Sequence, residues 1–118
     1  MATPIVHQGD WNCSDKLTSL EGAPSSIGGD FSCYNNNLTS LHNIHKQIKY
    51  IGGYADFERN PITSHVLGLL LIDGLMKVFL DKIKKVEEII NKHLAGERDI
   101  FACQEELIEN GFDEYAQL

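Results

Sequence analysis

The sequence predicts an α/β repeat fold with three short units, a degenerate fourth and closing helices. The first observation is a duplicated tetrapeptide, Leu-Thr-Ser-Leu, which stands at residues 17–20 and again at residues 38–41. The second is a short apolar alternation before each copy, and the third is a change to helical periodicity in the last third of the chain. We expect one domain with three parts: an N-terminal edge at 1–8, repeats at 9–82 and a helical cap at 83–118.

The middle unit fits the leucine-rich repeat pattern L-x-x-L-x-L-x-x-N-x-L most closely. Phe31 and Cys33 take the strand positions of this pattern, and Asn36 takes the turn position. Leu38 and Leu41 are the apolar positions that follow. The same places recur at Trp11, Cys13, Leu17 and Leu20, at Ala55, Phe57, Asn60, Ile62 and His65, and at Leu75, Val78 and Leu80. The spacing is 21 residues from Leu17 to Leu38 and 24 from Leu38 to Ile62. The pattern therefore predicts a short leucine-rich-repeat-like solenoid whose strands form one concave sheet.

The repeated units also carry a family resemblance. The stretches G-G-D-F-S-C-Y-N-N-N-L-T-S-L and L-T-S-L-E-G-A-P resemble the short leucine-rich-like repeats of small proteins of tailed bacteriophages. The resemblance covers roughly residues 9–82, and the tail after Asp81 resembles the helical ending of similar phage proteins. It implies a curved repeat fold and a viral origin, and it implies no catalytic residues.

Apolar periodicity predicts the remaining elements. A short helical turn is expected at Ile44–Ile51, and a buried helix at Val66–Ile72 is expected to lead into a last strand at Leu75–Leu80. The first C-terminal helix buries Val86, Ile89, Ile90, His93 and Leu94 and ends at Gly96. The second runs from Ile100 to Asn110 after an Asp99 N-cap, with Ile100, Phe101, Gln104, Leu107 and Ile108 on one side. We expect these helices to cover the open end of the repeats.

Charge and hydropathy restrict the partners. The 118 residues carry a net charge of −7, which argues against a general binder of nucleic acids or of anionic membranes. No charged leader followed by an apolar run is present, and the apolar run near Val66 is far shorter than the ~20 residues of a membrane span. We expect a cytoplasmic protein, in the host bacterial cytoplasm if it is viral, with a protein partner that has a basic patch.

The three cysteines, Cys13, Cys33 and Cys103, fit the small apolar places of the pattern. Bridging directly paired strands is geometrically awkward, so the sequence favours free thiols. His42 and His45 are an isolated i, i+3 pair without further ligands nearby, and no C-x-x-C pair occurs. Neither a metal nor a cofactor is predicted.

Strand alternation places a set of polar and aromatic residues on the outer face of the concave sheet. Ten of them form the predicted partner-binding surface: Asp10, Asn12, Asp30, Ser32, Tyr34, Tyr54, Asp56, Glu58, Lys77 and Phe79. Aromatic side chains beside fixed charges are common in interaction hot spots. The alternative is a solvated face whose acids keep an exposed sheet soluble.

An enzymatic role is not predicted. Asp56 and Glu58 stand two residues apart on one strand face, a spacing that suits a pair of catalytic carboxylates. However, no His or Lys is placed to tune them, and the pattern turns Arg59 away. The chain also has no P-loop and no G-x-S-x-G motif.

Two functions remain from different classes. The first is a protein-interaction module, a phage-encoded modulator or inhibitor of a host protein, with defence proteins among the targets. The second is a small-molecule or carbohydrate binder, in which Tyr34, Tyr54 and Phe79 stack on the ligand and Asn12, Asp30 and Asp56 anchor it. The sequence leaves the oligomeric state and the identity of the partner open.

Overall fold

The computed structural model describes residues 6–13, 18–20, 22–81 and 83–118. In this part of the chain the helices are α1 (Ile44–Gln47), the 3-10 helix η1 (Leu67–Leu71), α2 (Lys84–Ala95) and α3 (Ile100–Glu109). The strands are β1 (Val6–His7), β2 (Trp11–Asn12), β3 (Ser26–Ile27), β4 (Phe31–Ser32), β5 (Tyr50–Ile51), β6 (Tyr54–Asp56) and β7 (Lys77–Phe79). Leu17 and residues 1–5 of the predicted N-terminal edge lie outside the described residues.

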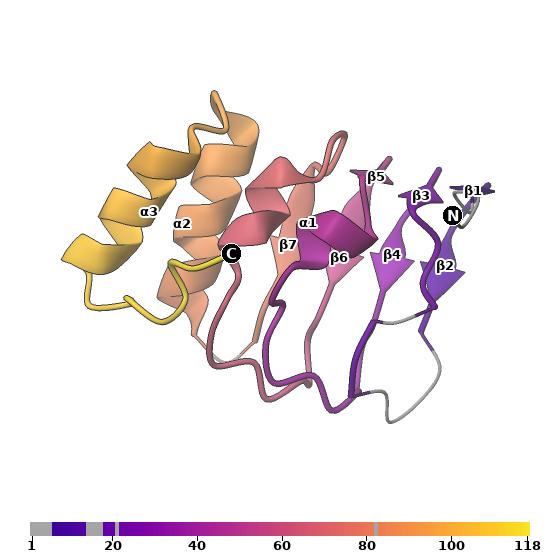
Figure 1. The fold of residues 1–118 in the computed structure, drawn as a ribbon, viewed down its shortest axis with the longest axis horizontal. Coiled ribbons are helices and arrows are strands. Elements are labelled where there is room, and N and C mark those ends of the chain that lie inside the picture. The colour runs from indigo at the N-terminus through magenta and orange to yellow at the C-terminus, as the bar shows by residue number, and fades with distance from the viewer. Residues whose placement is uncertain (1–5, 14–17, 21, 82) are drawn as a thin grey trace.

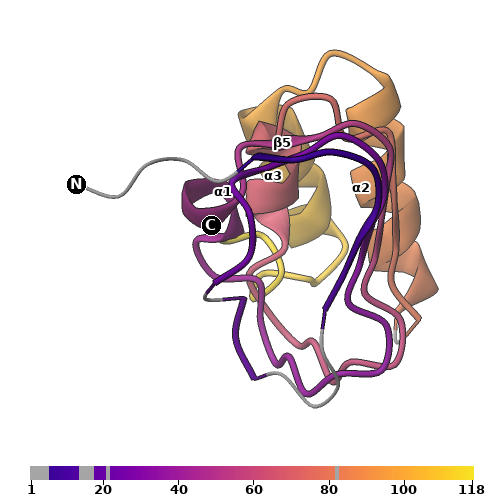
Figure 2. The same ribbon diagram turned by 90° about the vertical axis from the view of Figure 1, so that its right-hand side faces the viewer.

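The strands form two parallel sheets, one with the order β1-β3-β5 and the other with the order β2-β4-β6-β7 (Figure 1). Consecutive strands such as β1 and β2 belong to different sheets, and the chain bends sharply between them. The two sheets therefore meet at an angle, as Figure 2 shows. In the four-stranded sheet, register places Trp11, Phe31, Ala55 and Val78 side by side. These four side chains share the inner face, where all but the half-buried Trp11 are fully buried.

Aromatic rings continue from strand to strand inside this sheet. The rings of Trp11 and Phe31 are stacked with centroids 5.5 Å apart, and those of Phe31 and Phe57 are 5.7 Å apart. Phe31, Leu38, Phe57 and Ile62 belong to one buried cluster, and Leu20 packs against it. The apolar places that recur in the sequence thus do form one core.

Buried asparagines hold the turns that follow the strands. The Asn60 amide donates to the carbonyl oxygens of Cys33 at 2.7 Å and Phe57 at 3.0 Å. Its carbonyl oxygen accepts from the Leu38 backbone N–H at 3.0 Å. Because Asn60 is only 2 % exposed, these bonds replace the water that its amide and the neighbouring backbone lose on burial.

Helix α2 packs along β7, the last strand of the four-stranded sheet. The Asn91 side chain accepts from the Val78 N–H at 2.8 Å and donates to the Val78 carbonyl at 2.9 Å. The Glu87 carboxylate accepts from the Leu80 N–H at 2.6 Å. Two helix side chains therefore bond to backbone groups that a further strand would otherwise bind, and this edge of the sheet is covered.

The predicted fold class, a leucine-rich-repeat-like solenoid with one concave sheet and a helical cap, is wrong. The structure has two small parallel sheets, of three and four strands, together with three α-helices in a compact body of 38 × 29 × 25 Å. The reason lies in the segments before each bend. Residues 48–51 were expected to belong to a short helical turn, but β5 within them pairs with β3 and builds the second sheet.

The predicted local elements are found with some changes. The short helical turn is α1, and the buried apolar run forms the 3-10 helix η1. Helix α2 ends at Gly96, and the Asp99 carboxylate caps α3 by accepting from the backbone N–H groups of Phe101 and Ala102. The predicted inner side of α3 is partly wrong, because Phe101 is 77 % exposed and Ile108 is 47 % exposed.

Cys13 and Cys33 form a disulfide, so the prediction of free thiols is wrong for this pair. The parallel register of β2 and β4 sets their Cα atoms 4.8 Å apart, within the range of roughly 4.4–6.8 Å that disulfides span. Cys103 is a free, buried thiol in α3. Burial, with a smaller contribution from Glu106, raises the pKa of Cys103 to about 12, which keeps it an unreactive thiol at neutral pH.

Candidate functional site

The outer side of the four-stranded sheet carries the residues that strand alternation selected. Asn12, Ser32, Asp56 and Phe79 are paired in register across all four strands, and Tyr54 lies beside Lys77. We call the surface made by these and the flanking predicted residues the four-strand face. It comprises Asp10, Asn12, Asp30, Ser32, Tyr34, Tyr54, Asp56, Glu58, Lys77 and Phe79.

A hollow of about 290 Å³ opens in the middle of the four-strand face. Seven of the ten predicted residues line it, together with Phe31: Asp10, Asn12, Asp30, Ser32, Tyr54, Asp56 and Phe79. Tyr34, Glu58 and Lys77 do not line it. The structure therefore gathers most of the predicted surface around one depression that mixes carboxylates with aromatic rings.

The aspartates of the hollow are held in place by backbone N–H groups. Oδ1 of Asp10 accepts from the Asp30 N–H at 2.7 Å, and Oδ1 of Asp30 accepts from the Tyr54 N–H at 2.8 Å. Gly29 and Gly53 make this approach possible, because a Cβ at either position would overlap the aspartate that lies against it. Each of these aspartates therefore orders the start of the next strand as well as lining the hollow.

Asp56 and Glu58 differ in their surroundings. Oδ1 of Asp56 accepts from the Glu58 backbone N–H at 2.9 Å, so it fixes the turn after β6. Asp56 also lines the hollow, whereas Glu58 does not. The Asp56 carboxylate, at the end of β6, is therefore held in place by its bond to the Glu58 N–H.

Aromatic and cationic side chains stand next to the hollow. The rings of Tyr54 and Phe79 meet edge to face, with centroids 5.9 Å apart and an interplanar angle of 88°. The Lys77 ammonium lies 5.3 Å from the centroid of the Phe79 ring. Such cation–π pairs are stabilised by the negative face of the ring.

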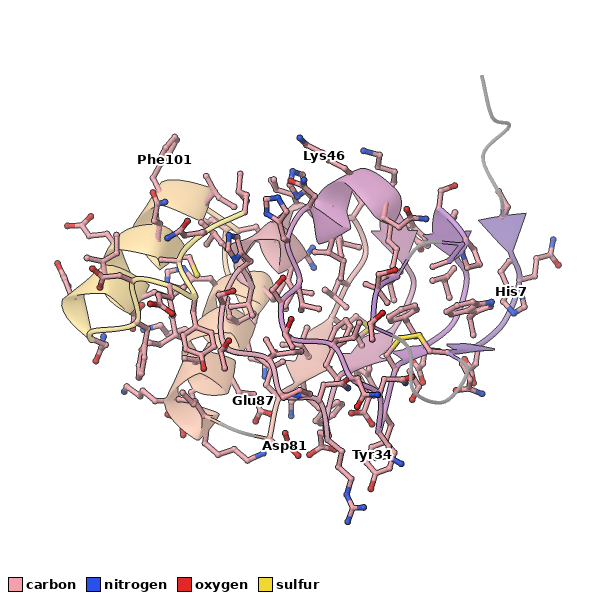
Figure 3. All side chains as sticks on the ribbon, turned by 60° about the horizontal axis from the view of Figure 1, so that its bottom comes forward. His7, Tyr34, Lys46, Asp81, Glu87 and Phe101 are labelled. Carbon is pink, nitrogen blue, oxygen red and sulfur yellow. A yellow bond between two sulfur atoms is a disulfide. The ribbon has the colours of Figure 1, made fainter. Side chains whose placement is uncertain are left out.

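Tyr34 forms a second aromatic position away from the hollow. The Arg59 guanidinium lies 5.7 Å from the Tyr34 ring centroid, although the sequence pattern was expected to turn Arg59 away. The Arg59 backbone N–H donates to Oδ2 of Asp81 at 2.8 Å, which holds this turn against the next one. Figure 3 shows Tyr34 and Asp81 on one side of the molecule and Lys46 and Phe101 on the opposite side.

Histidines gather next to α1, where the structure adds His65 to the pair His42 and His45 that the sequence showed. The rings of His42 and His65 are 4.8 Å apart, although the two residues are far apart in the chain. Burial, followed by the charge of Lys46, lowers the pKa of His45, and its Nδ1 is buried without a hydrogen-bond partner. Among the described residues no three His, Cys, Asp or Glu side chains are placed to hold a metal ion together.

Comparison with protein-family models, with curated proteins and with solved structures gave no match for this chain. Within residues 6–13, 18–20, 22–81 and 83–118, no helix combines the length and apolar character that crossing a membrane requires. Within the described residues, the four-strand face is therefore the surface from which a function is inferred.

Proposed function

We propose that the protein is a non-enzymatic interaction module that binds a basic protein partner on its four-strand face. The observation that carries this proposal is the hollow, which three backbone-held carboxylates line together with two aromatic rings. Fixed charges give specificity and a faster encounter with a partner of opposite charge, while aromatic rings provide apolar contact area. The net charge of −7 favours basic partners over nucleic acids.

The proposed setting is a phage-encoded modulator or inhibitor of a host protein, with defence proteins among the targets. The resemblance of the repeated units to small phage proteins supports this setting, and the host bacterial cytoplasm is the proposed location. A disulfide such as Cys13–Cys33 is uncommon in that compartment. The oxidation state of this pair in rapidly alkylated cells therefore tests the location separately from the function.

The test is affinity capture of basic proteins from bacterial lysate on the immobilised protein. Replacing Tyr34, Asp56 and Glu58 together by alanine removes one aromatic and two charges outside the core. It should weaken capture by on the order of 2–4 kcal/mol if these positions form a hot spot. The control variant, Lys46→Gln with Lys49→Gln, changes charge around α1, and Figure 3 shows Lys46 on the side opposite Tyr34. Loss of capture with the control alone would place the binding surface near α1.

A second candidate function is carbohydrate binding, and the hollow supports it. Tyr54 and Phe79 line the hollow together with the polar anchors Asn12, Asp30 and Asp56, as a sugar site requires. Tyr34, the third predicted stacking residue, is paired with Arg59 outside the hollow. Ionic strength distinguishes the two functions, because capture of a charged protein weakens with salt and stacking on a neutral sugar does not.

A further inference from the structure

We propose that the hollow of the four-strand face recognises arginine side chains of the basic partner. This inference rests on the proposed function and names the chemical group that the hollow selects. The occupant is a guanidinium that lies against Tyr54 and donates to Asp30 and Asp56.

Asp30 and Asp56 each use Oδ1 to accept from a backbone N–H, so their side chains are oriented before a partner arrives. Asp30 directly precedes Phe31, which pairs with Ala55, and it accepts from the N–H of Tyr54, two residues before Asp56; parallel strands lie about 4.8 Å apart. Two fixed acceptors on different strands favour a donor group with several divergent N–H bonds over a single point charge.

Aromatic rings distinguish this hollow from a merely acidic patch. Tyr54 is 45 % exposed and is held edge to face against Phe79, so its ring is available to a ligand in a fixed orientation. The four-strand face already binds cations in this way twice, because Lys77 lies over Phe79 and Arg59 lies over Tyr34. A partner's cation over the Tyr54 ring would form the same kind of cation–π contact.

The hollow favours arginine over lysine. A guanidinium is planar, so it can stack on Tyr54 while its edge donates to carboxylates, whereas an ammonium is a compact and strongly hydrated charge. Lys77 already supplies an ammonium beside Phe79. A phosphate or another anion does not fit, because Asp10, Asp30 and Asp56 would repel it.

The test uses three peptides of equal length in a neutral Gly-Ser background, with arginine, lysine or citrulline at the same places. Binding is measured by isothermal titration calorimetry at low and at physiological salt. We expect the arginine peptide to bind about tenfold more tightly than the lysine peptide. Only a guanidinium can stack on the Tyr54 ring and donate hydrogen bonds to two carboxylates at once. Citrulline has nearly the shape of arginine without its charge, so the citrulline peptide should not bind.

The variants Asp30→Asn and Asp56→Asn remove charge but keep an oxygen that can accept from Tyr54 and Glu58. Each should abolish the preference for arginine, and Tyr54→Leu should do the same by removing the ring. Glu105→Gln with Glu109→Gln removes charge from exposed positions of α3 and should leave the preference intact. Unchanged thermal unfolding identifies the variants that still fold.

The possible results separate failure of the arginine inference from failure of the proposed function. Equal binding of the arginine and lysine peptides, lost in Asp30→Asn, overturns the inference and leaves the proposed function standing. Binding of neither cationic peptide also overturns the inference, and lysate capture on the same variants then decides the proposed function by itself. Salt-insensitive binding of chitohexaose that Tyr54→Leu abolishes would replace both with the carbohydrate function.

Discussion

Asp10 and Asp30 show how single residues in this protein serve structure and surface together. Each carboxylate bonds through one oxygen to the backbone of the next strand and lines the hollow. Each also requires a glycine beside it, Gly29 or Gly53. The geometry of the hollow therefore depends on residues that lie outside it.

Gly53→Ala should destabilise the protein through this contact. The new methyl group would overlap the Asp30 carboxylate, which cannot move away without losing its bond to the Tyr54 N–H. Overpacking of this kind costs about 1–3 kcal/mol in the free energy of unfolding. Chemical denaturation measures the loss. Gly96→Ala is the matched control, because its Cβ would meet the nearest atom at 3.4 Å, an ordinary contact.

Asn60→Ala should be among the more damaging polar substitutions. It leaves the buried Leu38 N–H without its side-chain acceptor, whereas the Cys33 carbonyl keeps its bond from the Asn36 amide at 3.0 Å. Each unsatisfied buried group costs roughly 1–3 kcal/mol. Asn37→Ala, at an exposed position, is the comparison in the same denaturation experiment. Equal midpoints for the two variants would show that the Asn60 bonds contribute nothing.

The sequence predicted that Asn12, Ser32, Asp56 and Phe79 lie side by side on one face of the sheet, because alternation along a strand depends only on position. It did not predict that Asp10 and Asp30 bind backbone N–H groups, since nothing in the sequence marks an aspartate as an acceptor for the next strand. The disulfide was missed for a related reason. Cys13 and Cys33 were correctly placed at equivalent positions, but their ability to bridge depends on a Cα distance that spacing alone does not give.

At the scale of elements, α2 replaces a missing strand at the edge of β7. Asn91→Ala removes both bonds to Val78 and should expose an unpaired strand edge. We expect a loss of about 1–3 kcal/mol in the free energy of unfolding. We also expect more aggregation on heating, which light scattering measures. Glu88→Ala, at an exposed position of the same helix, should change neither quantity.

The pairing of α2 with α3 should make stability depend on pH. Hydrogen bonds from Lys92 and then from His93 lower the pKa of Glu106. A carboxyl with a lowered pKa in the folded state stabilises the fold above its unfolded pKa, about 4.3, and loses this effect as the pH falls through the folded value. The free energy of unfolding should therefore fall in acid.

Glu106→Gln should flatten this fall in stability below about pH 4.3, where the wild-type carboxylate takes up its proton. Glu105→Gln, which changes an exposed carboxylate of the same helix, should retain the wild-type dependence. Urea denaturation at a series of pH values gives both curves. Identical curves for wild type and Glu106→Gln would assign the acid sensitivity to other groups.

The second sheet explains why the fold class was predicted wrongly while the strand equivalences were right. Strand β5 was missed because Ile44, Ile48 and Ile51 stand at helical spacing, which favoured a helical turn over a strand at this place. The helices were easier, because twelve residues of α2 display a complete apolar stripe. The exposed Phe101 and Ile108 of α3 show the limit of that method, since side-chain type does not tell which of two adjacent stripes faces the core.

At the scale of the whole molecule, the four-stranded sheet has unequal ends. Helix α2 covers the β7 end of the four-stranded sheet, while the opposite end begins with β2, where Trp11 and Cys13 are only partly buried. The Cys13–Cys33 disulfide ties this end to the next strand. It thereby also fixes Asp10 and Asn12 relative to the rest of the hollow.

Reduction should therefore loosen the whole molecule from the β2 end. The disulfide closes a loop with a sequence separation of 20 residues, and the chain-entropy relation gives a contribution of roughly 3 kcal/mol for a loop of this size. Dithiothreitol should lower the thermal midpoint of the wild type by on the order of 10 °C. Cys13→Ser should unfold at the lowered temperature with or without reductant, because buried Cys103 has no disulfide to lose. A wild-type midpoint unaffected by reductant would show that the disulfide does not support the fold.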